Sequence, residues 1–248
     1  MKKIDSQKLV DFIERNAIIF NKRREIELKK FDFNCAILSQ NPYLFALNNK
    51  ATAGKIVTSL INSYLLPKEE LLLDELLKKL AIFVCTATNK AKKFSIKGVD
   101  LEFEKDGKVY LLIIVSPNSL INSPQLNNIE KVFQNAKVIL KRKTDKPIKT
   151  FLGYYFGSFT NDKKDLYETI SGQSFWKLVS GSSKFYQDII EPLKQSINKK
   201  NENLLNEYYR SINIFATQFS NEFCVNGVIN WKKIVQLNSG KQKIKVNL

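Results

Sequence analysis

The alternation of apolar and polar positions predicts helices over most of the first third of the chain. Apolar residues at helical spacing predict a basic amphipathic helix over residues 5–30, and the segment NPYLFAL at 41–47 begins with a helix-start signal. Residues 53–66 and 68–84 predict two further helices. We expect them to be separated at Pro67, because proline has no backbone N–H to donate inside a helix.

The middle of the chain changes to a strand pattern. Residues 98–117, GVDLEFEKDGKVYLLIIVSP, predict two strands joined by Asp106-Gly107, a favoured pair for a two-residue hairpin turn. This turn pairs Lys105 with Lys108, so we expect Glu102 to lie opposite Leu111 and Asp100 opposite Ile113.

The rest of the chain predicts a helix over residues 125–142, a strand over 150–159, and helices from Ser174 onward. This order of elements predicts a mixed α/β fold, with a sheet core flanked by helices and a helical C-terminal region. No internal repeat or long linker divides it.

We therefore expect a single domain over residues 1–248. Its predicted parts are an N-terminal helical part (1–95), a sheet core (96–160) and a helical C-terminal part (161–248). No apolar stretch approaches the length needed to span a membrane, and the N-terminus lacks the pattern of a signal peptide. The expected location is the cytoplasm.

Composition adds a prediction about partners. Forty Lys and Arg against 24 Asp and Glu give a net charge of +16. Such a charge favours a polyanionic partner, nucleic acid before membrane, because neutralised phosphates supply most non-specific affinity. A generally Lys-, Asn- and Ile-rich composition is the alternative explanation.

The residue types also limit the chemistry. The three cysteines are scattered, and histidine is absent. This composition excludes zinc sites built from Cys and His and every mechanism that needs a histidine base. Catalysis would have to use carboxylates, lysines, hydroxyls and hard metal ions.

Asp100 and Glu102 are the candidate catalytic pair. Residues two apart on a strand point to one face, so the two carboxylates are expected to project together. Beside a strand pair in a strongly basic protein, they suggest magnesium-dependent phosphodiester cleavage. A solvated strand edge is the alternative, because an Asp-x-Glu spacing is common by chance.

The same stretch resembles a family of type II restriction endonucleases in the PD-(D/E)xK nuclease superfamily. The likeness includes the run GVDLEFEKDG, the following Y-L strand and the segment ending N-S-P-Q. It continues in the same order outside the hairpin, in NPYLFAL, LLKKLAIFV, LGYYFG, GQSFW, IIEPL and LNSGK. The resemblance implies a restriction-endonuclease-like fold and site-specific cleavage of double-stranded DNA within a restriction–modification system.

The resemblance also implies site residues and partners. Asp100 would ligate Mg²⁺ with assistance from Glu102, and Mn²⁺ is an expected substitute. A homodimer is expected, because one two-fold axis then serves both strands of a symmetric site. The candidate DNA contacts are Ser116, Asn118, Asn122, Ser123 and Gln125. Turn formation is the alternative role for such residues, and the resemblance favours DNA contact.

The chain departs from the family pattern at the second strand. Relatives end this strand I-K-S, whereas this chain has Ile114-Val115-Ser116, and Ile113 replaces a polar or acidic residue. Three explanations compete. Lys78 could supply the missing lysine, although a solvated helix lysine is the simpler interpretation. The chain could instead be a catalytically impaired relative that binds DNA without cutting it. The third explanation is that Val115 was introduced artificially to inactivate the protein. Ile113 argues against this explanation, because a single introduced substitution would not account for two changed positions.

Overall fold

The structure is a computed structural model that describes residues 4–47, 52–95, 97–117, 123–158, 166–199 and 201–240. The chain divides into two compact units. The first unit comprises Met1–Ala17 and Asp74–Ser196, and the second comprises Ile18–Leu73 and Ile197–Leu248. The predicted single domain stays a prediction, and each unit is described here by itself.

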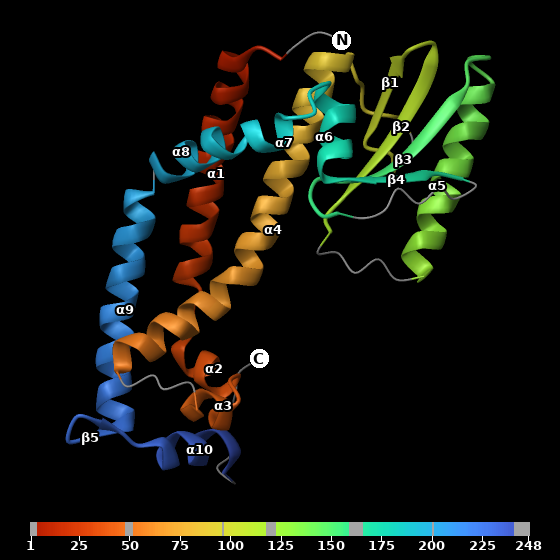
Figure 1. Ribbon diagram of the computed structural model, residues 1–248. Coiled ribbons are helices and arrows are strands. Elements are labelled where there is room, and N and C mark those ends of the chain that lie inside the picture. The colour runs from red at the N-terminus through yellow and green to blue at the C-terminus, as the bar shows by residue number, and fades with distance from the viewer. Residues whose placement is uncertain are drawn as a thin grey trace. The chain divides into compact units, whose positions relative to one another are not determined.

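Helices predominate, as the sequence predicts, and the predicted mixed α/β class is confirmed (Figure 1). In chain order the elements are α1 (Ser6–Lys29), α2 (Phe33–Leu38), α3 (Pro42–Leu47), α4 (Ala53–Asn89), β1 (Leu101–Lys105), β2 (Lys108–Val115), α5 (Ser123–Lys141), β3 (Ile148–Tyr154), β4 (Glu168–Ser171), α6 (Gly172–Ser180), α7 (Phe185–Asp188), α8 (Ile190–Lys199), α9 (Glu202–Phe223), β5 (Cys224–Val225), β6 (Val228–Ile229) and α10 (Trp231–Ser239).

The first unit contains a four-stranded mixed sheet with strand order β1-β2-β3-β4. The β1–β2 pair is antiparallel, and the β2–β3 and β3–β4 pairs are parallel. The hairpin has the predicted register, with Glu102 opposite Leu111 and Lys105 opposite Lys108. Asp106 and Gly107 both have positive φ, at 49° and 69°, as the tight turn requires.

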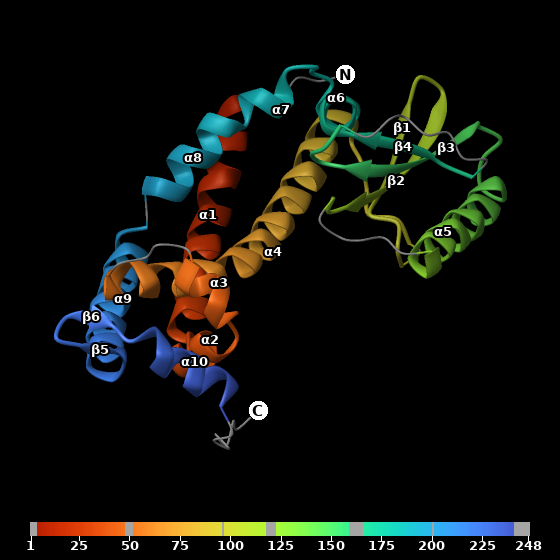
Figure 2. The same ribbon diagram turned by 60° about the horizontal axis from the view of Figure 1, so that its bottom comes forward.

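Both faces of this sheet are covered, which explains why β2 is almost continuously apolar. One face, with Leu112 and Ile114, packs against buried residues of α4 and α6. The other face, with Leu111 and Ile113, packs against α5 through Phe133. Two views show α5 on the side of the sheet away from α4 and α6 (Figure 1, Figure 2).

The interior of the sheet leaves no room for a side chain at Gly153 of β3. A Cβ built at this position would lie 2.6 Å from Cδ2 and 2.8 Å from Cε2 of Phe175, which belongs to α6. It would also lie 3.0 Å from Cδ1 of Leu112. Glycine therefore permits the close approach of α6 to the sheet.

Helix α4 corrects one prediction. It is a single helix of 37 residues with Pro67 inside it, rather than two helices separated there. A proline removes one hydrogen bond of the helix, and neighbouring packing can outweigh that loss. Just beyond the proline, the Lys68 ammonium donates to the carbonyl oxygen of Tyr64 at 3.3 Å and lies 3.6 Å from the centre of the Tyr64 ring.

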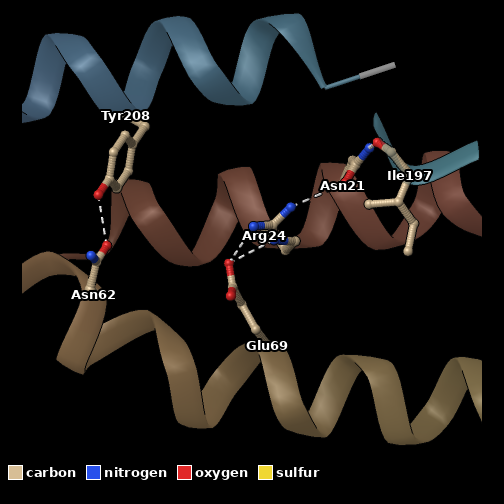
Figure 3. Close-up of polar contacts among 6 residues, drawn as sticks. All are labelled: Asn21, Arg24, Asn62, Glu69, Ile197 and Tyr208. Carbon is tan, nitrogen blue, oxygen red and sulfur yellow. Dashed lines mark hydrogen bonds and ion pairs between the residues drawn. The ribbon is translucent and has the colours of Figure 1, made fainter. Parts of the chain in front are cut away.

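The second unit has an aromatic-rich core formed by residues of α2, α3, α4, α9 and α10. The second unit also contains a group of polar contacts between its helices (Figure 3). Within it Arg24 Nη2 lies 2.6 Å from Glu69 Oε1, Asn21 Nδ2 donates to the Ile197 carbonyl at 2.7 Å, and the Tyr208 hydroxyl donates to Asn62 at 2.7 Å. Arg24, Asn62, Glu69 and Tyr208 line a pocket of about 580 Å³.

Other element predictions are partly right. Strand β3 begins at Ile148 and ends at Tyr154, so it is displaced from the predicted range of 150–159. Strand β4 and the β5–β6 hairpin lie in segments where no strand was predicted. No helix of the described ranges is long and apolar enough to cross a membrane.

Candidate active site

The carboxylate of Asp100 is the centre of the candidate site. Asp100 immediately precedes β1, and its backbone N–H donates to the Leu112 carbonyl at 3.0 Å. Its side-chain Oδ2 accepts a hydrogen bond from the backbone N–H of Ile114 at 2.7 Å. The described pairing of β1 with β2 starts at Leu101 opposite Leu112, so Asp100 lies just outside the ladder and contacts β2 through both its backbone and its side chain.

Lys78 of α4 contacts this carboxylate. Its Nζ lies 2.8 Å from Asp100 Oδ1 and donates to the carbonyl oxygen of Ile114 at 3.1 Å. The Lys78 side chain is 41% exposed and that of Asp100 is 19% exposed. The structure thus brings together two candidates that the sequence had placed on separate elements.

Glu102 lies opposite Leu111 in the hairpin, two residues beyond Asp100. Its backbone forms an isolated bridge with Lys92, with both N–H groups donating at 2.8 Å. Its side chain is partly buried, and no described residue gives the Glu102 carboxylate an ion pair or a hydrogen bond. Strand alternation leads us to expect that Glu102 and Asp100 share a face.

Ile113 and Val115 continue that face on β2. Ile113 is 6% exposed and belongs to the hydrophobic cluster that includes Phe133 of α5, and Val115 packs against the same cluster. Each contributes only hydrocarbon to this face of the sheet. Neither can ligate a metal, donate a proton or orient a water molecule.

This donor set does not fit a magnesium ion. Magnesium prefers near-octahedral oxygen ligands, usually with one or two carboxylates. Both oxygens of Asp100 already accept contacts, one from Lys78 and one from the Ile114 amide.

A second polar contact lies one helical turn from Lys78. Asp74 precedes Lys78 by four residues on α4, and its Oδ1 accepts a short hydrogen bond from the hydroxyl of Tyr155. Burial raises the pKa of Tyr155 above its ordinary value of about 10, and the bond to Asp74 raises it further. Trp176 fixes the backbone here, because its indole N–H donates to the Tyr155 carbonyl at 2.8 Å.

Sequence reasoning missed Asp74 and gave Tyr155 no functional role. Tyr155 is buried. Its hydroxyl also interacts with Ser116, the residue that follows β2 and was predicted to contact DNA. The only sequence signal for Asp74 is its spacing from Lys78, and a four-residue spacing of opposite charges is ordinary on a helix.

The remaining predicted DNA contacts are less well placed by the structure. Asn118 and Asn122 lie outside the described residues. Ser123 is the first residue of α5, and Gln125 is an exposed residue of its first turn. Their predicted contacts with DNA stay predictions.

Basic residues at two places in the chain differ in their surroundings. Lys141, Arg142 and Lys143 at the end of α5 are all exposed. Arg24, by contrast, is paired with Glu69 inside the second unit.

The mixed sheet with Asp100 at the start of its antiparallel hairpin agrees with the nuclease class that the motifs indicated. A comparison with protein families identifies the group within this class. The model of the type II restriction endonuclease EcoO109I family matches residues 7–201. The chain belongs to this family of type II restriction endonucleases. A search of curated protein sequences gives no significant match.

Proposed function

We propose that this protein binds a short specific sequence in double-stranded DNA through a restriction-endonuclease fold, without efficient strand cleavage. The observation that carries the proposal is the state of Asp100. Its carboxylate is held by Lys78 and by the Ile114 amide, and Ile113 and Val115 beside it are apolar. The family membership and the net charge of +16 support DNA as the partner.

A homodimer is part of this proposal. Two copies related by a two-fold axis would present identical surfaces to the two halves of a symmetric DNA site. Sedimentation of the free protein and of its DNA complex would test it. A single monomer bound per site would contradict it.

Magnesium-dependent cleavage is the second candidate, and it is the activity of the family. The contact between Lys78 and Asp100 favours it, because Lys78 could replace the lysine that the family pattern has at position 115. A lysine in such a site orients the attacking water and stabilises negative charge on the phosphate. In this alternative Asp100 and Glu102 would have to bind Mg²⁺, or Mn²⁺ in its place, after Lys78 had left the carboxylate.

The deciding experiment has two readouts from the same proteins. Unmethylated phage DNA is incubated with Mg²⁺ and either the natural protein, Val115→Lys, or the double variant Ile113→Glu with Val115→Lys. In parallel, binding to a pool of random duplexes is followed by sequencing of the retained molecules. We expect the natural protein to enrich one short sequence and to leave phage DNA intact.

Discrete fragments from the natural protein would overturn the proposal in favour of cleavage, and Lys78→Ala would then test the replacement lysine. Fragments from the double variant alone would show that fold and recognition are intact and that the apolar positions prevent hydrolysis. Retention of duplexes without any sequence preference would instead indicate a general nucleic-acid-binding protein.

A further inference from the structure

Two oxygen atoms converge on the ammonium group of Lys78. One is Oδ1 of Asp100 at 2.8 Å, and the other is the carbonyl oxygen of Ile114 at 3.1 Å. They come from two segments of the hairpin region, one from the residue that precedes β1 and one from within β2. Carboxylate and backbone carbonyl oxygens are also ligands that hard divalent cations accept in proteins. The ammonium therefore lies where a cation would share these two oxygens.

The surroundings of Asp100 favour such a positive charge. The side chain of Asp100 is only 19% exposed, and the apolar Ile113 shares its face of the sheet. A partly buried carboxylate is costly unless it is paired and hydrogen-bonded. Lys78 supplies the pairing, and the Ile114 amide supplies the second hydrogen bond.

The position of Lys78 is fixed by its helix. Leu80 and Ala81, which follow it on α4, are fully buried in the core beneath the sheet. A group attached to a packed helix acts at a far higher effective concentration than a free ion. A dissolved divalent cation would have to displace this tethered ammonium before it could reach Asp100.

One N–H of the ammonium is left for another partner. Lysine has three N–H donors, and among the described residues Asp100 and Ile114 accept two of them. The side chain is 41% exposed, so the third can point to solvent. A phosphate oxygen is a suitable acceptor, because a charge-assisted hydrogen bond to phosphate is strong.

We propose that the ammonium of Lys78 is a built-in substitute for the divalent cation, so that the protein holds a DNA phosphate at this site without metal. The phosphate half of this inference rests on the proposed function. The cation half concerns only residues of this chain. The ion pair between Lys78 and Asp100 explains why these residues do not fit magnesium, because it uses the carboxylate that a metal ion would need.

The first test measures metal binding without DNA. Thermal unfolding and calorimetry with MnCl₂, MgCl₂ and CaCl₂ are compared for the natural protein, Lys78→Glu and Lys79→Glu. Lys79 is the exposed neighbour on α4, so its variant changes net charge equally and leaves the site intact. We expect millimolar cation to raise the Tm of Lys78→Glu by several degrees, and to leave the other two nearly unchanged.

Two results would overturn the cation half. One is saturable cation binding to the natural protein as tight as to Lys78→Glu. The other is a folded Lys78→Glu variant that responds to cations no more than Lys79→Glu does. If Lys78→Glu does not fold, Lys78→Gln removes the charge without adding a carboxylate. It is expected to bind Mn²⁺ more tightly than the natural protein.

The second test measures retention of the enriched duplex in EDTA and in CaCl₂. The natural protein and Lys79→Glu should each bind equally well under both conditions. Lys78→Glu should lose at least tenfold in affinity in EDTA and regain it with Ca²⁺. Equal loss by Lys78→Glu under both conditions would show that a cation does not replace the ammonium. A natural protein that retains no DNA would refute the proposed function, and the metal titrations would still decide the cation half.

Discussion

Lys78 and Asp100 are separated by 22 positions in the chain, yet their side chains meet at 2.8 Å between Nζ and Oδ1. The contact joins α4 to the start of the hairpin, and Asp100 in turn binds the backbone of Ile114 in β2. The carboxylate is therefore both an ion-pair partner and a support for the sheet. These two roles can be separated by mutation.

Asp100→Ala should destabilise the protein by about 1–3 kcal/mol, because it leaves the Ile114 amide without its acceptor. Asp100→Asn should cost less than about 1 kcal/mol, since an amide oxygen can still accept that bond. Loss of the ion pair adds little, because Lys78 is 41% exposed. Urea unfolding of both variants measures the difference. Equal losses would mean that the ion pair, and not the backbone bond, supports the fold.

Substitutions at the two apolar positions should differ in cost. Ile113→Glu alone should destabilise by about 2–4 kcal/mol, because Ile113 is 6% exposed and packs beside Phe133. Val115→Lys should cost less than about 1.5 kcal/mol, since Val115 is only partly buried and a lysine can extend its ammonium to water. Thermal unfolding ranks the two. A larger loss at position 115 would show that its side chain is more tightly packed than we infer.

Gly153→Ala should destabilise the sheet by about 1–3 kcal/mol, because its Cβ would lie 2.6 Å from a ring carbon of Phe175. The matched control is Gly54→Ala near the start of α4, where no atom lies within 4 Å of the added Cβ. That change should be neutral or stabilising by up to about 1 kcal/mol. Chemical denaturation of the pair provides the comparison. A neutral Gly153→Ala would mean that α6 can move away from β3.

Stability should fall in alkaline solution, and Tyr155 should account for part of the fall. Burial raises the pKa of Tyr155 in the folded protein above its ordinary value of about 10. Above that value the unfolded chain loses this proton while the folded protein retains it, so stability decreases as pH rises. The contribution is complete below pH 10 and is lost as pH rises toward the folded pKa.

Tyr155→Phe should therefore be less stable than the natural protein near neutral pH, and should lose less stability between about pH 9 and pH 11. Urea unfolding at a series of pH values for both proteins measures this. The comparison is needed because other groups act in the same direction, including Cys85, whose pKa burial raises to about 12. Parallel curves for the two proteins would exclude Tyr155 as a source of the slope.

Local signals predicted the hairpin well. The Asp106-Gly107 turn fixed the pairing of β1 with β2, because a two-residue turn leaves only one register. The helix start at Asn41 is also local, and its side chain accepts from the N–H of Tyr43 at 3.0 Å. Such features depend on residues a few positions apart, so the sequence alone contains them.

The errors arose where tertiary packing decides the structure. Pro67 ends many helices, yet both halves of α4 bury apolar residues, and that burial favours one continuous helix. Strand β4 is four residues long and exists because β3 provides its hydrogen-bonding partner. The Asn226-Gly227 turn between β5 and β6 was a readable hairpin signal within a segment predicted as helical.

The candidate site shows the same division. The expected common face of Asp100 and Glu102 came from strand alternation and stays a prediction. The contact of Lys78 with Asp100 and that of Asp74 with Tyr155 join segments that lie far apart in the sequence. The pattern of residues in a single sequence does not show which distant side chains come into contact. The sequence could nominate Lys78, and the structure was needed to place it on the carboxylate.

The apolar pair Ile113 and Val115 has a consequence for the cell that carries this gene. An active restriction enzyme endangers its host unless a methyltransferase first modifies every chromosomal site. If the proposed function holds and hydrocarbon at these two positions prevents cleavage, the gene should be expressed harmlessly in bacteria that have no such methyltransferase. Its persistence would then be independent of the modification gene, and its benefit would have to come from occupying DNA and not from breaking it.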